Sequence, residues 1–393
     1  MNIKMKNVLR LLGCLFIAVL AGCSDNEHLP EPIPEPGNHN SHFVPLDDAI
    51  RKAERSFSDF FGATRAGRTV KNVEFLNTIT RADGSDINGQ FYIVNYENDG
   101  GFAVLSSDDR LEPVYALSDE GSLHLSDTIE NKGLSWYMNR YLSAAAINPV
   151  DTGKHDFEGP SPELFRIIRA PRSSFLQKFH QSAPYNTYCL TTTGETSVVG
   201  CVPLAVGTMM GCNKWPQSYG SDSFNWTAMM ADSRHDGWAR LFRICGNKEN
   251  TEAEYLAEET LAEPKYIART INNMGYINAK EVYFNADLLE SQFNSTQGPL
   301  ICSGKYNINR FQWEGHSWIL DGYQIGETTY PDGKTFYKHY LHCVWGWGGK
   351  SNGYYLYQGE TLGHIVTGRD PGFTDSSLPF TGLSICYGYQ KDI

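Results

Sequence analysis

The chain has 393 residues, of which 41% are hydrophobic and 20% charged, and its formal net charge at pH 7 is −12. An acidic protein of this kind does not suit nucleic acid, and we find no basic patch interleaved with aromatic residues. Nine cysteines are present, yet no Cys-x-x-Cys or His-x-x-x-His spacing occurs, so we expect neither a metal site nor another cofactor. The length predicts two globular domains.

Residues 1–23 have the features of an export signal. Three basic residues precede an apolar run over 11–20 that is too short to remain across a bilayer. The run ends in Leu-Ala-Gly-Cys, which resembles the lipobox of bacterial lipoproteins, where cleavage before the cysteine leaves it to be acylated. We therefore expect Cys23 to carry a lipid anchor in the outer membrane, with the mature protein exposed at the cell surface and a processed form released. An ordinary secretory signal with a chance cysteine is the alternative.

Three segments separate the signal from the region that carries the chemistry. Residues 24–42 are Pro-rich and polar and predict an extended spacer. Residues 43–150 predict a small α+β domain, which contains no cysteine and no cluster of histidines and carboxylates. Its expected elements are helices over 47–60 and 133–146 and strands over 91–95, 101–106 and 112–116. Residues 151–172 are largely polar with several prolines, which indicates an exposed, cleavable connection.

The most informative stretch surrounds Cys201. Apolar residues after it recur at the spacing of one buried helical face, Gly200 precedes the helix, and Pro203 falls in its first turn, where a missing N–H costs nothing. This face is formed by Val202, Ala205, Val206, Met209 and Met210. Cys201 would then begin a helix, beside unpaired backbone N–H groups that stabilise a thiolate. Taken alone, a cysteine at such a place is more often a small apolar residue, so a catalytic role needs a second group.

A second informative stretch contains His316. The residues around it predict a strand, another strand is expected over 335–345, and residues 331–334 have turn chemistry. If the strands pair across that turn, His316 lies opposite about position 349, at the end of the Trp-Gly-Trp-Gly-Gly run that begins at Trp345. An imidazole beside an aromatic, Gly-rich turn is a candidate for the base that a nucleophilic cysteine needs. Taken alone, such a histidine is more often a structural residue.

A helical cysteine followed along the chain by a histidine on a β-hairpin is the order of a papain-like architecture, although the papain signature around the cysteine is absent. Four patches resemble the streptopain family of bacterial cysteine peptidases, namely residues 181–186, 200–216, 315–323 and 345–355. The Trp-Gly-Trp-Gly-Gly run is the most specific of them. The resemblance implies an α+β fold, with a papain-like peptidase domain over 173–393 in which the cysteine-bearing helix packs on an antiparallel sheet that bears the histidine. Residues 43–150 are similar to the family's inhibitory propeptide, which implies a zymogen.

The resemblance also implies roles for individual residues. Cys201 is the nucleophile and His316 the general base, the backbone N–H of Cys201 is one oxyanion donor, and Gln181 is the candidate for the second. Trp345 and Trp347 would shield the histidine from water. Gln181 is equally well explained as a surface residue in a turn, and plain core aromatics would give the same pair of tryptophans.

The chain departs from the family pattern at Val344, where an asparagine usually precedes the first tryptophan of the run. A valine side chain accepts no hydrogen bond, so the His316 imidazole must be oriented by a backbone carbonyl, by His342 or by another group. Losing the usual orienting group weakens such an enzyme without abolishing catalysis, because the remaining groups retain much of the rate enhancement.

The sequence therefore predicts a lipid-anchored cysteine endopeptidase, made as a zymogen, that hydrolyses protein or peptide substrates through an acyl-enzyme without a cofactor. Its own propeptide would be its intramolecular inhibitor. Two alternatives stay open. One is another papain-like acyl chemistry, such as that of a transferase or deamidase. The other is a surface lipoprotein that has lost catalysis and binds peptide or protein, which the departure at Val344 favours.

Overall fold

The computed structural model describes residues 42–62, 67–76, 79–80, 86–87, 91–109, 111–138, 142, 164–169, 175–284, 286–295, 299–309, 312–329, 335–358, 383–388 and 390–391. The expected export signal, Cys23 and nearly all of the spacer fall outside these residues, as do most of the connection 151–172 and the turn 331–334. The residues from 40 onward form one compact unit. Within the described part of the chain, no helix is long and apolar enough to cross a membrane.

The chain is built from both helices and strands, as expected for an α+β protein. The helices are α1 (Leu46–Phe61), α2 (Asp127–Glu130), α3 (Lys132–Trp136), α5 (Cys201–Asn213), α6 (Trp226–Ala231), α7 (Asp236–Cys245), α8 (Ile267–Asn273) and α9 (Ala286–Ser295), with 3-10 turns η3 (Leu176–Lys178) and η4 (Pro264–Tyr266). The longer strands are β1 (Val70–Leu76), β4 (Phe91–Tyr96), β5 (Phe102–Ser106), β6 (Val114–Ser118), β7 (Leu164–Arg169), β13 (Lys280–Tyr283), β14 (Leu300–Asn309), β15 (Gln312–Thr329), β16 (Thr335–Val344), β17 (Gly353–Gln358) and β18 (Ser384–Tyr387). Short two-residue strands are β2 (Ile79–Thr80), β3 (Asp86–Ile87), β8 (Ser218–Tyr219), β9 (Asp222–Ser223), β10 (Glu254–Tyr255), β11 (Thr260–Leu261), β12 (Tyr276–Ile277) and β19 (Gln390–Lys391).

The N-terminal domain contains the expected first helix and strands, whereas the helix expected over 133–146 appears as α3, which ends at Trp136. Helix α1 covers the range expected over 47–60, and it buries Ala49, Ala53 and Phe57, which lie one turn apart on one face. Strands β4 and β5 pair antiparallel around a tight turn. The turn needs Gly101, whose φ is +94° and where an added Cβ would lie 1.8 Å from the Ser118 carbonyl oxygen. The Gly-rich hairpin predicted from the sequence is therefore confirmed.

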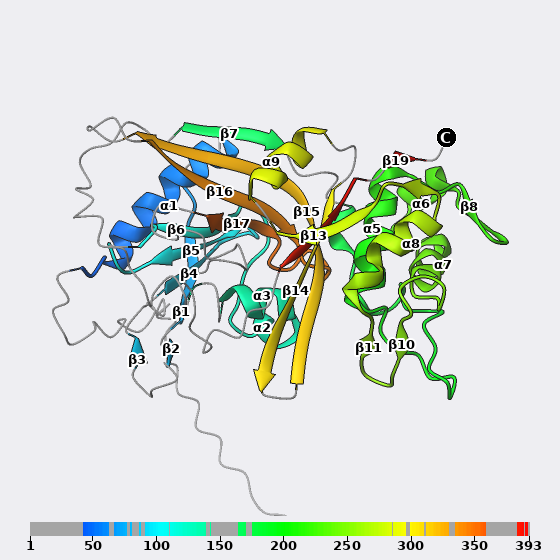
Figure 1. Ribbon diagram of the computed structural model, residues 1–393. Coiled ribbons are helices and arrows are strands. Elements are labelled where there is room, and N and C mark those ends of the chain that lie inside the picture. Colours follow the sequence, from blue (N-terminus) through cyan, green and yellow to red (C-terminus); the bar gives the residue numbers. More distant parts are fainter. Residues whose placement is uncertain are drawn as a thin grey trace, which may run out of the picture. The chain divides into compact units, whose positions relative to one another are not determined.

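The strands of the N-terminal domain and of the C-terminal half form one continuous sheet. Its described strands run in the order β1-β4-β5-β6-β17-β16-β15-β14-β18-β13, and β7 pairs with β15. The junction is the antiparallel pairing of β6 with β17, where Tyr354 lies opposite Leu117 and Tyr355 opposite Ala116. In Figure 1 the cyan strands of the N-terminal domain accordingly lie beside β17. The N-terminal domain is thus joined to the rest of the chain by backbone hydrogen bonds as well as by side chains.

Strand β15 is the longest strand described and it carries His316. The hairpin with β16 begins where Ile319 pairs with Val344, and a bulge follows between Leu320 and Gly322. His316 lies beyond that hairpin and pairs with Gly304 on β14. The expectation that His316 lies opposite position 349 was therefore wrong, because the bulge shifts the register and β16 ends before it reaches that level.

Part of the expected connection 151–172 is also a strand. Residues 164–169 form β7, which pairs antiparallel with β15 between Glu327 and Tyr323. The expected connection therefore includes a strand, because the run Leu-Phe-Arg-Ile-Ile-Arg has the composition of one and pairs with the edge that β15 offers.

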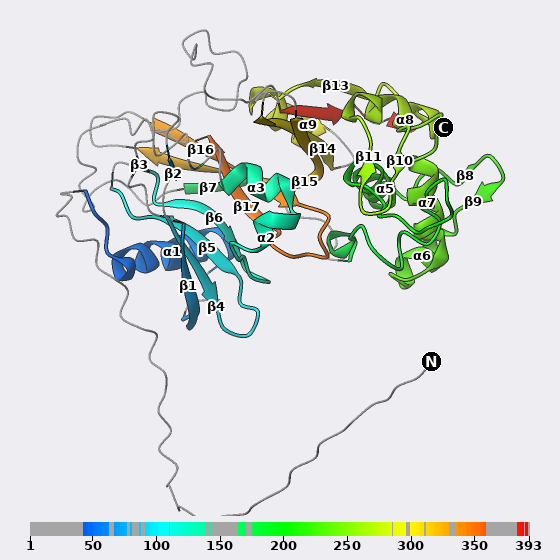
Figure 2. The ribbon, with the colours of Figure 1, turned by 90° about the horizontal axis from the view of Figure 1, so that it is seen from below.

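Two hydrophobic cores lie on this framework. The first is shared by α1, by β4–β6 and by β14–β17, so it contains residues of both the N-terminal domain and the C-terminal half. Aromatic contacts cross between the two parts, with ring centroids 4.8 Å apart for Phe60 and Tyr340 and 4.9 Å apart for Tyr137 and Tyr355. The second core surrounds α5 and α7. Figure 2 shows α2 and α3 beside β15 and β17, and residues of α3 contact β15.

Candidate active site

Helix α5 begins at Cys201, as the sequence predicted. Gly200 precedes it with a φ of +88°, and an added Cβ at Gly200 would meet the Thr260 side chain at 2.8 Å. All five residues of the expected apolar face are buried, but the opposite face is buried too. Small residues explain this, since a Cβ on Gly207 would lie 2.5 Å from the Phe242 ring. The helix is therefore a central element of the second core rather than an amphipathic one, and Cys201 at its start is held firmly.

The Cys201 thiol is half-buried and faces backbone N–H groups. Burial raises the pKa of the thiol above its ordinary value, although hydrogen bonds from the N–H groups of Ser317, Val202 and Cys201 itself act in the opposite direction. The N–H groups at the start of the helix thus stabilise a thiolate, as expected. The cost of removing the thiolate from water is larger, so the pKa of the thiol is raised. The contact with Ser317 also shows that the sulfur lies beside the residue that follows His316.

The His316 imidazole is buried, with 4% of the residue exposed. Its Nε2 atom lies 2.8 Å from the Trp345 carbonyl oxygen, which can only accept, so Nε2 carries the proton. Burial lowers the pKa of His316 to about 4, and the hydrogen bond to Trp345 offsets this only in part. The ring also stacks on Trp318, with centroids 6.2 Å apart and planes inclined by 13°. His316 is therefore a neutral imidazole at pH 7, fixed by a carbonyl and an indole.

Helix α3 of the N-terminal domain packs against this imidazole. A Cβ added to Gly133 would lie 2.7 Å from His316 Cδ2 and 2.7 Å from Trp345 Cζ3, so no side chain fits at that position. Cys201 and His316, both within the described residues, make no hydrogen bond to each other. The sulfur and the ring thus occupy neighbouring positions on α5 and β15, but the ring is turned to the Trp345 carbonyl beneath Gly133.

The space next to Cys201 is nearly closed. A cavity of about 10 Å³, close to the minimum for one water molecule, is lined by Cys201, Ser317, Val344 and Trp345 among others. Among the residues that the structure describes, no group of three or more His, Cys, Asp or Glu side chains could hold a metal ion.

The loop from Trp345 to Asn352 holds the acceptor of His316 in place. The Asn352 side chain accepts a hydrogen bond from the Trp345 N–H at 3.1 Å and donates one to the Gln177 carbonyl at 3.1 Å. The Trp345 indole donates to the Ser351 carbonyl at 3.0 Å. Asn352 was not predicted from the sequence, and its only signal there was its place in the patch that resembles the streptopain family.

His316 has a hydrogen-bond acceptor although residue 344 is a valine. The valine is buried in the second core, and the backbone carbonyl of the next residue, Trp345, accepts the imidazole proton. His342, which the sequence offered as another orienting group, instead binds Asp321 through Nδ1 at 2.6 Å. Of the orienting groups considered from the sequence, a backbone carbonyl therefore binds His316, whereas His342 binds Asp321.

The remaining predicted residues surround the same loop. Gln181 is buried, and its backbone carbonyl accepts the Val199 N–H at 2.9 Å, just before α5. Its neighbour His180 forms a β-bridge with Trp347. Trp345 is fully buried with its ring 5.1 Å from that of Trp318, whereas Trp347 is half-buried. Trp345 therefore packs on Trp318, the ring on which His316 stacks, while Trp347 joins the loop to the segment that leads to Cys201.

Comparisons with known proteins agree with this geometry. Residues 179–355 match the model of the peptidase C10 family, and residues 43–144 match the model of the Spi protease inhibitor. These matches support a streptopain-like cysteine protease with an inhibitory prodomain. Streptopain of Streptococcus pyogenes is 21% identical over 378 residues, which cover 83% of this chain and 87% of that one. The papain-like fold preceded by an inhibitor-like domain, expected from the sequence, is confirmed.

Two further relatives show how much of the chain the similarity covers. The thiol protease/hemagglutinin PrtT of Porphyromonas gingivalis is 21% identical over 359 residues, which cover 82% of this chain but 40% of that protein, so this chain spans less than half of its length. The solved structure of a prointerpain A fragment from Prevotella intermedia has a TM-score of 0.53 at 18% identity, and the match covers 81% of this chain and 99% of the fragment. At this identity the structural match concerns the fold, and it includes the N-terminal domain.

Proposed function

We propose that the chain is the zymogen of a cysteine endopeptidase in which Cys201 is the nucleophile and His316 the general base. The observation that carries this proposal is the contact of the Cys201 sulfur with the N–H of Ser317, the residue that follows His316, while the His316 imidazole binds the Trp345 carbonyl and lies against Gly133. A nucleophile and a base on neighbouring elements, kept apart by a separate domain, are the parts of an inhibited thiol enzyme.

Release of α3 would let the two groups act together. With Gly133 gone, the imidazole shifts toward the sulfur while Nε2 keeps its hydrogen bond to the Trp345 carbonyl, and water reaches both groups. Solvation lowers the pKa of the thiol and raises that of the imidazole, since burial causes both shifts in the closed state. Both changes favour the transfer of the thiol proton to His316, which yields a thiolate and an imidazolium.

The reaction then follows from this pair. The thiolate attacks the scissile carbonyl carbon, and the resulting oxyanion accepts hydrogen bonds from the Cys201 N–H and from the Gln181 side chain. His316 gives its proton to the leaving amine, and a thioester forms. His316 then takes a proton from water, whose oxygen attacks the thioester, and the acid product and free thiol are released. No step needs a cofactor.

The N-terminal domain would inhibit the enzyme through several simultaneous contacts with the peptidase domain. Its α3 covers His316, its β6 pairs with β17, and its Glu112 lies 3.2 Å from Lys338 of β16 in a buried ion pair. The Tyr137 hydroxyl donates to the Leu356 carbonyl at 3.0 Å. Cleavage between the domains, in or near the connection 151–172, would remove the covalent link and allow these contacts to dissociate.

Labelling of the thiol tests this proposal. An epoxide inhibitor of thiol proteases should modify Cys201 stoichiometrically in the processed protein and far more slowly in the uncut chain, and His316→Ala should abolish labelling. Turnover of casein by the processed protein would then distinguish a peptidase from a transferase or deamidase. Processed protein that leaves Cys201 unlabelled would instead favour a binding protein without catalysis.

Export and anchoring are a separate part of the proposal. The lipobox-like residues before Cys23 support a lipoprotein that is held in the outer membrane and exposed at the surface. Cys23→Ser should move the protein from the membrane fraction to the soluble fraction, and mass spectrometry should find acyl chains on the N-terminal cysteine of the wild-type protein. An unmodified Cys23 within an intact chain would contradict anchoring.

A further inference from the structure

A chain of hydrogen bonds leads from the His316 imidazole to a buried carboxyl group that the mechanism does not use. It begins at the Trp345 carbonyl, which lies 2.8 Å from His316 Nε2. The side-chain oxygen of Asn352 accepts the Trp345 N–H at 3.1 Å, and its amide nitrogen donates to the Gln177 carbonyl at 3.1 Å. The Asn352 side chain therefore joins the loop that holds His316 to the 3-10 turn η3.

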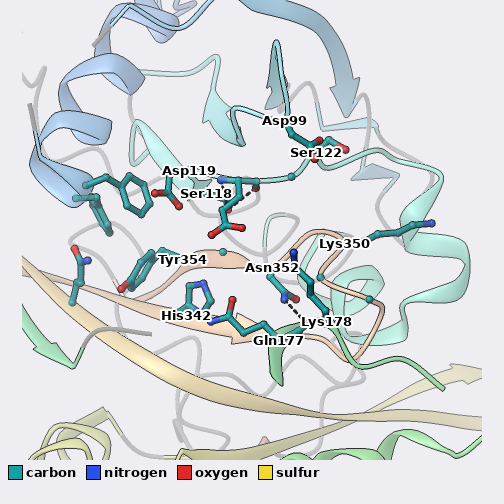
Figure 3. A pocket seen from close by; sticks show the side chains of 18 residues that line it. Asp99, Ser118, Asp119, Ser122, Gln177, Lys178, His342, Lys350, Asn352 and Tyr354 are labelled. Atoms are coloured by element: carbon teal, nitrogen blue, oxygen red, sulfur yellow. Dashed lines mark hydrogen bonds between the residues drawn. The ribbon is translucent and has the colours of Figure 1, made fainter. Parts of the chain in front are cut away.

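The next link is the side chain of Gln177. Its Nε2 atom donates to Asp321 Oδ2 at 3.0 Å. The other oxygen of that carboxyl group, Oδ1, lies 2.6 Å from His342 Nδ1. Figure 3 shows Gln177, Asn352 and His342 close together, with the bond from Asn352 to Gln177 as a dashed line. One carboxyl group thus binds both η3 and strand β16.

Asp321 is placed for these contacts by a β-bulge. The register of β15 against β16 shifts between Leu320 and Gly322, so Asp321 is the extra residue of β15. A bulge changes the direction of the side chain that it carries, and bulges are common beside active sites. Asp321 is 3% exposed, and burying a carboxyl group costs free energy unless hydrogen bonds compensate for it. The bulge and the buried carboxyl group, on the strand that carries the catalytic histidine, indicate a role beyond packing.

Every member of this hydrogen-bond chain lies in the peptidase domain. Cleavage in the connection 151–172 therefore does not separate these residues, whereas release of α3 removes the contact of Gly133 with His316. In the processed enzyme the imidazole must still be held while it exchanges protons with the sulfur and the leaving amine. The Trp345 carbonyl is its acceptor, so the position of that carbonyl matters most once α3 has gone.

We propose that Asp321 is a positioning residue for His316, a role that rests on the proposed peptidase function. Through Gln177 and Asn352 it keeps the Trp345 carbonyl where Nε2 of the imidazole can donate to it. An imidazole held in this way presents Nδ1 to the sulfur, and a small misplacement of a reacting group slows catalysis. Asp321 itself takes no part in proton transfer.

The pH profile distinguishes positioning from a purely structural role. The hydrogen bond to Trp345 raises the pKa of His316. Trp318 and Gly133, which also pack on the ring, carry no charge, and the Cys201 thiol on α5 is a titratable group beside it. A weaker hydrogen bond would therefore lower the pKa of the imidazolium, and the alkaline limb of kcat/KM would move to lower pH.

Asp321→Ala in the processed enzyme is the first test. With activity expressed per Cys201 that an epoxide inhibitor labels, kcat should fall about tenfold or more, while KM changes less than about twofold. The alkaline limb of kcat/KM should move down by about half a pH unit. Asn250→Ala is the matched control, because Asn250 is also a buried polar residue and donates to the Ile244 carbonyl. It should lower stability without changing kcat or the alkaline limb.

A pair of substitutions tests the contact itself. Gln177→Glu places a carboxylate where Asp321 needs a donor, so the two groups repel each other and kcat should fall about tenfold. Adding Asp321→Asn restores one donor and one acceptor with their roles exchanged, and kcat should return to within about threefold of wild type. Gln177 lines a cavity of about 610 Å³, so a substitution there has room. This pair decides the question if Asp321→Ala does not fold.

A spectroscopic measurement needs no turnover. In the uncut chain carrying Cys201→Ala and isotope-labelled histidine, the Nε2–H resonance of His316 is assigned by its loss in His316→Gln. Asp321→Ala should move this resonance upfield and speed its exchange with water, because the hydrogen bond to the carbonyl becomes weaker. Asn250→Ala should leave it in place.

The outcomes for the two proposals differ. An unchanged kcat and alkaline limb in Asp321→Ala would overturn the positioning role, as would a double variant no more active than Gln177→Glu, or equal losses in Asn250→Ala. A wild-type chain that neither converts nor labels at Cys201 would instead contradict the peptidase proposal. The His316 resonance would then still report whether Asp321 holds the ring.

Discussion

The N-terminal domain contacts the peptidase domain tightly in one place and loosely in another. At Gly133 there is no room for a methyl group above His316 and Trp345. Around Tyr354 and Asp119 the same two domains leave a cavity of about 610 Å³. Inhibition needs the first kind of contact, since a buried ring cannot turn. The second kind leaves space for water between the two domains.

The largest expected effect comes from breaking the buried ion pair that joins the domains. Glu112 is 4% and Lys338 8% exposed, so Lys338→Met would remove a positive charge that faces a buried carboxylate. The free energy of unfolding of the uncut chain should fall by about 3–5 kcal/mol. The double variant Glu112→Leu with Lys338→Met should recover much of that loss, and chemical denaturation measures both. Equal losses in the single and double variants would show that packing, and not charge, holds this contact.

Filling the tight contact should weaken inhibition. Gly133→Ala places a methyl group 2.7 Å from the His316 and Trp345 rings, and overpacking of this kind costs about 1–3 kcal/mol. Labelling of Cys201 in the uncut chain should therefore be about 5- to 100-fold faster. Ser135→Ala on the same helix is the matched control and should leave the rate unchanged. If Gly133→Ala labels no faster than wild type, α3 is not what restrains His316.

Acid should also loosen the tight contact. His316 has a pKa of about 4 in the closed state, against about 6.5 for an ordinary histidine. Between these values the open or unfolded chain binds a proton and the closed chain does not, so stability falls as pH decreases through this window and is fully present above it. From pH 6.5 to pH 5 the loss should be about 2 kcal/mol.

Chemical denaturation of the Cys201→Ala chain across this range measures the effect of acid. The comparison is the same chain with His316→Gln, which keeps a donor for the Trp345 carbonyl but does not titrate. An identical pH dependence in the two chains would assign the loss of stability to other groups.

The smallest effect is expected at the departure from the family pattern. Val344→Asn should change kcat/KM of the processed enzyme by less than about threefold, because the Trp345 carbonyl already accepts the His316 proton. Val344 is 4% exposed in the second core, so a polar side chain there should lower stability by about 1–3 kcal/mol. A tenfold or greater gain in kcat/KM would show that the carbonyl is a poor substitute for a side-chain amide.

Some elements of this protein could be predicted from local patterns in its sequence. The start of α5 at Cys201, the β4–β5 hairpin at Gly101 and helix α1 follow from residue spacing, from a glycine that needs positive φ and from one apolar face. The family was also visible, because the Trp-Gly-Trp-Gly-Gly run and the segments around Cys201 and His316 lie in short contiguous patches.

Tertiary structure decided what these residues do in the uncut chain. The sequence placed a stabilised thiolate at Cys201, yet burial against the second core reverses the direction of its pKa shift. The acceptor of His316 is a backbone carbonyl, which every residue possesses and no sequence motif marks. Residue identity thus determined which chemistry is available, whereas the distances and desolvation that switch it off arise only when Gly133 packs against His316.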